Sequence, residues 1–172
     1  MKKLGYIIAA VVIPAIFAPA VSAQQSTSYI QKSDNTTGGV AGIVKADIRP
    51  STSQSLGPAH RIQVYTGNQP LTQLTIQPLY NVRVDENNIQ VIEDESNGKL
   101  DATVTVDEQN KVTIAFAQPV PPEKVLEIRM FGLTPPNQFF PKSLAYSVNG
   151  SYEGMSQTMP FGVVQVRTYG PR

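Results

Sequence analysis

The sequence has no cysteine and no tryptophan, and it contains a single histidine, His60. Without cysteine the chain can form neither a disulfide nor a thiolate metal site, and it has no cysteine nucleophile. One histidine also falls short of the ligand sets that zinc and copper take. We therefore expect a domain that its apolar core alone holds together, without a cofactor.

The lone histidine also limits the catalytic options. A Ser-His-Asp triad would have to use His60, and no Gly-x-Ser-x-Gly segment occurs in the sequence. His60 stands at the start of a predicted strand, where we expect a solvated side chain. We assign no catalytic residue.

Charged residues are few and balanced, with 14 basic and 13 acidic side chains in 172 residues. The basic residues are scattered singly. This distribution offers no electrostatic attraction to nucleic acid or to an anionic membrane surface. We expect a partner of another class, an envelope protein or a polysaccharide.

The first 23 residues have the organisation of a signal peptide. Lys2 and Lys3 precede an apolar stretch, and Val21-Ser22-Ala23 places small residues where signal peptidase requires them. Cleavage would leave 149 residues, enough for one domain, with no membrane span. The alternative is an uncleaved anchor over residues 4–21, which would contain two prolines. We expect export to the periplasm or the extracellular space.

The mature chain divides into an arm and a domain. Residues 24–39 are polar and predict a flexible N-terminal arm, with the alternative that it pairs with an exposed sheet edge, its own or a neighbour's. Residues 40–170 predict a single β domain. Short apolar-alternating runs separated by Pro, Gly and Asn indicate about eight strands of an antiparallel immunoglobulin-like β-sandwich. Ten segments are candidates for these strands, with 82–84 the least regular of them: residues 43–48, 60–66, 71–76, 82–84, 89–92, 103–106, 112–116, 126–130, 143–148 and 161–169.

Residues 111–133 hold two of these strands and a proline-rich connector. Pro119-Val120-Pro121-Pro122 should lie outside any sheet interior, since proline has no N–H to donate. The alternation after the connector favours a strand over a helix. We expect six side chains here to be among the most buried: Val112, Ile114, Phe116, Leu126, Ile128 and Met130. Further on, Asn149-Gly150 predicts a turn.

The densest group of oxygen ligands is the acidic loop over residues 93–98 with Asp101. Alternating oxygen-bearing side chains before a glycine are typical of calcium loops, and the candidate ligands are Glu93, Glu95, Asn97 and Asp101. The twelfth loop position, where a bidentate glutamate is usual, holds Val104. The alternative is a plain solvated turn.

Two further hypotheses concern other side chains. Asp94, Asp101 and Glu127 are the carboxylates available for a hydrolase of an envelope polymer, although a chain without tryptophan lacks the usual sugar platforms. The Phe139-Phe140 loop is either an exposed apolar patch for a partner or a cap folded onto the core.

The order of these motifs resembles a known family. It includes Pro70-Leu71-Thr72-Gln73-Leu74-Thr75-Ile76, then Val112 to Phe116, the proline connector, and finally Phe161-Gly162 leading to Val166-Arg167-Thr168-Tyr169. The chain resembles the exported cyanobacterial domain-of-unknown-function family numbered 2808, over residues 40–169. The resemblance implies a secreted or periplasmic single domain and supplies no catalytic residue, cofactor or ligand.

These observations favour an exported, non-catalytic binding or structural module of the cell envelope or extracellular space. The alternatives are a carboxylate-dependent hydrolase and a calcium-dependent adhesive module.

Overall fold

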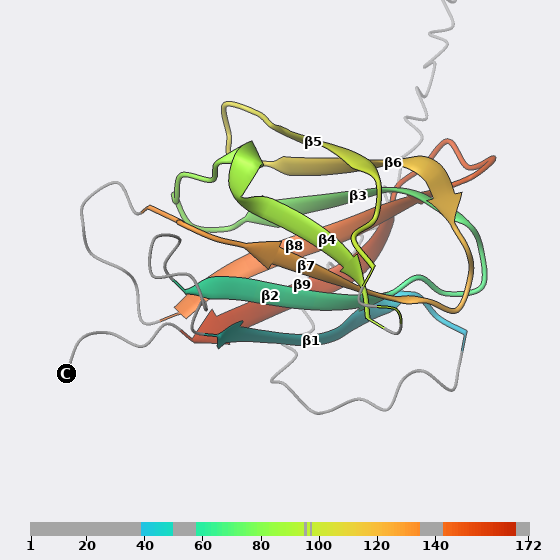
Figure 1. The fold of residues 1–172 in the computed structure, drawn as a ribbon, viewed down its shortest axis with the longest axis horizontal. Coiled ribbons are helices and arrows are strands. Elements are labelled where there is room, and N and C mark those ends of the chain that lie inside the picture. Colours follow the sequence, from blue (N-terminus) through green and yellow to red (C-terminus); the bar gives the residue numbers. More distant parts are fainter. Residues whose placement is uncertain (1–38, 50–57, 95, 97, 135–142, 168–172) are drawn as a thin grey trace, which may run out of the picture.

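The computed structural model describes residues 39–49, 58–94, 96, 98–134 and 143–167. These residues form two antiparallel sheets packed face to face, which confirms the predicted immunoglobulin-like sandwich (Figure 1). The nine strands are β1 Gly42–Arg49, β2 Ala59–Tyr65, β3 Leu71–Pro78, β4 Ile89–Glu93, β5 Ala102–Val106, β6 Val112–Val120, β7 Val125–Met130, β8 Ser143–Tyr152 and β9 Met159–Arg167. A single turn of 3-10 helix, η2 (Glu86–Asn88), leads into β4.

The strand order identifies the type of sandwich. One sheet has the order β1-β2-β7-β4 and the other β5-β6-β3-β8-β9. If the β5–β6 hairpin is set aside, the seven remaining strands reproduce the A-B-E-D and C-F-G sheets of an immunoglobulin domain. The hairpin is therefore an insertion between the fourth and fifth strands of that pattern, and it extends the second sheet beyond β3.

The core lies between the two sheets and follows the period-2 alternation of the strands. In β8, the side chains of Leu144, Tyr146 and Val148 are fully buried, and the intervening residues are half-buried. Five of the six side chains expected to be most buried in residues 111–133 have no exposed surface: Val112, Ile114, Leu126, Ile128 and Met130. The sixth, Phe116, is only half-buried; its cross-strand partner on the outermost strand is the small residue Ala102.

The proline connector departs from the prediction, since β6 continues through Pro119 to Val120. Val120 is buried and pairs with Leu71, and an irregularity separates this pair from the regular pairing at Gln73 and Ala115. Extra residues in one strand of a pair form a bulge, where a missing N–H disturbs no regular ladder bond. The prediction that this segment lies outside the sheet interior was therefore wrong at Pro119 and Val120, the last two residues of β6.

Beyond that bulge, Thr66 fixes the rest of the connector. Its buried hydroxyl donates to the Pro121 carbonyl at 3.3 Å and accepts from the Lys124 amide at 3.0 Å. The Glu123 amide donates to the Gly67 carbonyl at 2.7 Å. The turn after β2 thus holds the segment that enters β7.

The predicted turn at Asn149-Gly150 is also wrong, because both residues lie inside β8. The glycine serves packing: a Cβ on Gly150 would come within 3.0 Å of Leu71 Cδ1 and closer still to the ring of Phe161. Phe161 on β9 lies over the space that a side chain at position 150 would take. Tertiary packing, and not a turn, requires glycine here.

The segment around Val82 and Val84 is not a strand. Arg83 makes one isolated bridge to Thr134, and the two valines are buried beneath it. The predicted signal peptide, most of the arm and the Phe139-Phe140 loop lie outside the described residues.

Candidate functional site

The outer face of the four-stranded sheet carries a network of charged side chains around Glu127. Glu127 is only 1% exposed, and its carboxylate accepts hydrogen bonds from Arg61 of β2 and from its neighbour Arg129. Gln63 donates to Glu127 and to Asp94, both at 3.2 Å. Of the three carboxylates considered for hydrolysis, Asp94 and Glu127 thus share one amide, whereas Asp101 makes no contact with this group among the described interactions.

The electrostatics of Glu127 oppose a role as general acid. Burial favours the protonated carboxyl, but the hydrogen bonds and charges of Arg61 and Arg129 outweigh burial, and the pKa of Glu127 lies below its usual value. A general acid needs a raised pKa in order to hold a proton near neutral pH. The carboxylate instead cross-links β2 and β7.

His60 is not the solvated residue that we expected. It is 3% exposed, and its Nδ1 lies 2.8 Å from the hydroxyl of Tyr146, a fully buried side chain of the other sheet. Their rings meet edge to face, with centroids 6.0 Å apart. Burial lowers the pKa of His60 to about 4 and raises the pKa of Tyr146, so both side chains are neutral at pH 7. The pair joins the two sheets, and the sequence carried no signal of it.

The proposed calcium ligands are only partly described. The carboxylate of Glu93 forms an ion pair with Lys124 at 3.0 Å and accepts from the Ser96 hydroxyl at 2.8 Å. These two bonds lower the pKa of Glu93 below its usual value. Asp101 is exposed at the start of β5, and Glu95 and Asn97 lie outside the described residues. Among described residues, no three carboxylate or imidazole side chains gather as metal ligands.

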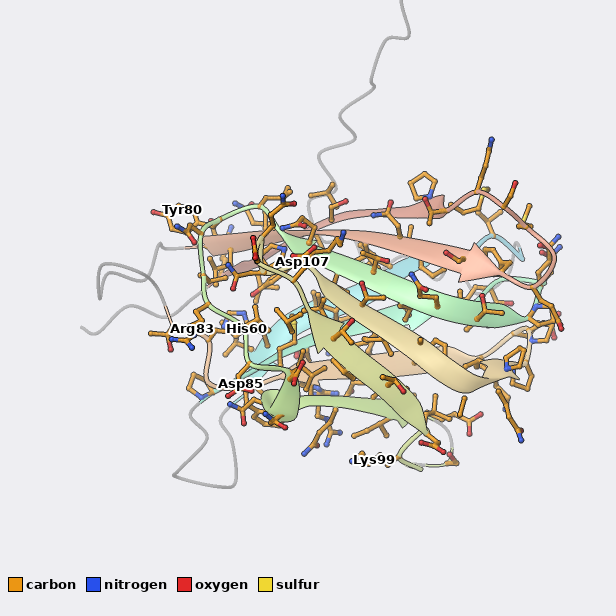
Figure 2. All side chains as sticks on the ribbon, turned by 90° about the horizontal axis from the view of Figure 1, so that it is seen from above. His60, Tyr80, Arg83, Asp85, Lys99 and Asp107 are labelled. Atoms are coloured by element: carbon orange, nitrogen blue, oxygen red, sulfur yellow. The ribbon has the colours of Figure 1, made fainter. Side chains whose placement is uncertain are left out.

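A polar depression of about 820 Å³ opens where η2 approaches the β5–β6 turn. Figure 2 shows Arg83, Asp85 and Asp107 around this end of the sandwich. Asp85 and Asp107 each accept backbone amide bonds within their own turns, at 3.0 Å from Asn87 and 2.9 Å from Gln109. The sequence signal for this depression is a pair of similar segments, Asp85-Glu86-Asn87-Asn88 and Asp107-Glu108-Gln109-Asn110, both of which form turns.

An apolar depression of about 330 Å³ lies at the side of the sandwich where β1 begins. Val40 is 75% exposed, and Met155 and Met159 are each 45% exposed. Phe161 of β9 and Tyr152 of β8 complete the apolar wall. The hydroxyl of Tyr152 donates to the Thr66 carbonyl at 2.9 Å, which keeps that ring in place. The depression thus lies beside β9, where the N-terminal arm joins the domain.

Strand β5 forms the opposite edge of the five-stranded sheet. Within the described chain, β6 is its only hydrogen-bonded neighbour strand. Thr103 and Thr105 are exposed, and the strand contains no charged residue and no proline. Sequence alternation predicts such a strand but does not predict which strand is left at an edge.

Comparison with solved structures gives fold-level likenesses only. The collagen-binding subdomain of the Enterococcus faecalis surface protein ACE is 7% identical, with a TM-score of 0.47 over 72% of this chain and 95% of that chain. The collagen-binding domain of a Staphylococcus aureus adhesin is 10% identical, with a TM-score of 0.42 over 74% and 97%. The N-terminal domain of the Streptococcus gordonii adhesin Sgo0707 is 13% identical, with a TM-score of 0.47 over 76% and 32%. These values are too low to transfer any property of those proteins to this chain.

Three further findings bear on classification. No curated protein matches the sequence. Among the described residues, there is no helix with the length and apolar character that a membrane crossing requires. Residues 59–139, from β2 to beyond β7, match the family described as "Protein of unknown function (DUF2808)", and this match supports the family resemblance carried by the proline and strand motifs.

Proposed function

We propose that the chain is an exported, non-catalytic module that binds a partner or builds a structure in the cell envelope or outside the cell. In this proposal, residues 1–23 are a signal peptide, residues 24–39 form an arm and the sandwich is the working domain. The cyanobacterial source implied by the family resemblance belongs to the same proposal.

The observation that carries the proposal is the kind of surface that the sandwich leaves open. It presents an uncharged strand edge at β5 and an apolar depression beside β9, where Val40, Met155 and Met159 are exposed. Free edges and exposed apolar side chains are features by which domains recognise polypeptides. The partner class that this favours is a protein, with an envelope polysaccharide as the alternative.

The conspicuous ionisable side chains support the same proposal, because their bonds are internal. Glu127 is held by two arginines, and Glu93 by Lys124 and Ser96. His60 is buried against Tyr146. Each of these groups is bonded to another side chain of the protein and is not free to react with a substrate.

Two measurements test the proposal. The first is co-purification of the exported chain from its own envelope after cross-linking, where we expect one reproducible partner. The second compares envelope glycan turnover by the wild-type chain and by a double Asp94→Asn, Asp101→Asn variant, where we expect no turnover by either. Turnover by the wild-type chain that the double variant loses would replace the binding module with the hydrolase.

A further inference from the structure

The free edge of β5 shows few of the features that protect sheet edges. Natural edge strands commonly carry lysine, proline or an inward-pointing charge, which prevent another strand from pairing with them. The five residues of β5, Ala-Thr-Val-Thr-Val, have none of these, and the flanking charges, Asp101 and Asp107, lie just outside the strand. The edge therefore has unpaired backbone groups available for a further strand, and η2 approaches it only at the Val106 end.

The burial of the hairpin indicates which side chains a further strand would cover. Val112 and Ile114 on β6 have no exposed surface, whereas their cross-strand partners on β5, Val106 and Val104, are only half-buried. On the inner face of the sheet, the side chains thus change from fully buried on β6 to half-buried on β5. The two strands are one strand spacing apart, about 4.8 Å. An added strand with an apolar side chain on its inner face would cover Val104 and Val106.

The chain itself contains a segment of suitable chemistry outside the described residues. In residues 24–38, the only apolar side chains are the adjacent Tyr29 and Ile30, within the uncharged run Ser26-Thr27-Ser28-Tyr29-Ile30-Gln31. Neighbouring residues of a strand point to opposite faces. One of the two side chains would therefore reach the inner valine row, and the other would lie beside Thr103 and Thr105. Lys32 follows directly, and it would lie near Asp101 at one end of β5 if the added strand is antiparallel to β5, or near Asp107 at the other end if it is parallel.

The place where this segment joins the domain indicates which copy supplies it. Gly39 and Val40 line the same depression as Met159 and Phe161 of β9. In the same sheet, β9 and β5 are opposite edges, separated by four strand spacings or about 19 Å. In Figure 1, β1 and β9 lie along one side of the sandwich and β5 along the other. Residues 32–38 span at most about 25 Å when fully extended, so the arm reaches its own β5 edge only if it is stretched across the sandwich. A head-to-tail contact with a second copy needs no such extension, and it repeats from copy to copy.

We propose that residues 26–31 of one copy add as a sixth strand to β5 of a second copy. The contact combines backbone hydrogen bonds with burial of Tyr29 or Ile30 over Val104 and Val106. Because it is head-to-tail, the product is an open chain of subunits. This proposal rests on the proposed function and names its partner as another copy of this chain.

Two variants separate the donor from the acceptor. Val104→Lys places a charge on the inner face of the edge strand, where it blocks an added strand while the half-buried position lets the ammonium group reach water. Deletion of residues 24–38 removes the donor and none of the described strands, the first of which begins at Gly42. Val163→Lys is the matched control, since Val163 is 43% exposed on β9 at the other edge.

The measurement is sedimentation velocity over a hundredfold concentration range, on chains purified from an exporting host. We expect the wild type and Val163→Lys to form species of increasing mass, and both Val104→Lys and the deletion variant to stay at the mass of one subunit. An equimolar mixture of these two monomers should form a dimer, because the arm of one fits the edge of the other. Thermal melting of each variant checks that it is folded.

Three results would overturn the proposal. They are a wild type that stays monomeric throughout the range, a deletion variant that assembles like the wild type, and a mixture that stays monomeric. If Val104→Lys does not fold, a peptide of residues 24–34 replaces it: the peptide should raise the melting temperature of the deletion variant, and a Tyr29→Lys, Ile30→Lys peptide should not. Failure of all assembly leaves the proposed function standing, since co-purification of a partner and glycan turnover test that function separately.

Discussion

His60 and Tyr146 make a buried polar contact between the sheets, and this contact has a pH dependence. The pKa of His60 is about 4 in the folded chain, against an ordinary value of 6.5. Between these values the unfolded chain binds a proton that the folded chain does not, so the free energy of unfolding falls as the pH falls from 6.5 to 4. Above pH 6.5 the contribution of neutral His60 to the free energy of unfolding is fully present. Lowering the pH to 4 removes about 3 kcal/mol of it.

Chemical denaturation of the wild type and of His60→Gln between pH 4 and pH 8 checks this expectation. The variant keeps a hydrogen-bonding side chain without the titration, so its stability should change less across that range. Carboxylates titrate in both proteins, so their effect cancels when the stability of the variant is subtracted from that of the wild type. Parallel curves for the two proteins would show that His60 does not titrate on unfolding.

Gly150 is the second residue whose role depends on tertiary contacts. Because a Cβ at this position would collide with Phe161 and approach Leu71, we expect Gly150→Ala to lower the free energy of unfolding by roughly 1–3 kcal/mol. Urea denaturation measures the loss. Ser147→Ala, at a half-buried position of the same strand, is the control and should change stability little. Addition of Phe161→Leu should restore part of the free energy of unfolding that Gly150→Ala removes. If the losses of the two single variants simply add in the double variant, the packing explanation is contradicted.

At the scale of elements, the loop between β4 and β5 contains the candidate calcium ligands. Its Glu93 already has Lys124 and Ser96 as partners. We therefore expect millimolar calcium to leave the melting temperature unchanged, as in a solvated turn. A rise with calcium that Asp101→Asn abolishes, and that magnesium does not reproduce, would instead establish the calcium-dependent module.

The strands show how far local pattern predicts an element. The alternation of Leu126, Ile128 and Met130 identified β7 correctly against the helical alternative, because apolar periodicity is a property of neighbouring residues. The extension of β6 through Pro119 was not predictable in this way. Whether a proline is tolerated depends on the bulge opposite Leu71, a residue far away in the sequence.

For the whole molecule, the nine strands form a complete sandwich between Gly42 and Arg167. We expect removal of residues 24–38 to leave the melting temperature and the cooperativity of unfolding unchanged when the protein is dilute. Differential scanning calorimetry at low concentration measures both. A broadened or strongly lowered transition would show that the arm belongs to the folding unit.

The candidate surfaces of the whole molecule were less predictable than its fold. The sequence predicted a flexible arm and gave pairing with a sheet edge only as the alternative, and it did not indicate which edge is open or how far that edge lies from the arm. It also could not show that Asp94 and Glu127 share Gln63, since residues 63 and 127 are 64 positions apart.

By itself, the sequence determined the β class, most strand positions and the dependence on an apolar core, because alternation, turn residues and the absence of cysteine are properties of short segments or of composition. The tertiary structure alone decided that His60 is buried, that position 150 requires glycine and that β5 is left at an edge. His60 and Tyr146 are 86 residues apart, and edge status depends on the order of all strands in the sheet. Such features arise only when distant segments pack, so no local pattern in the chain encodes them.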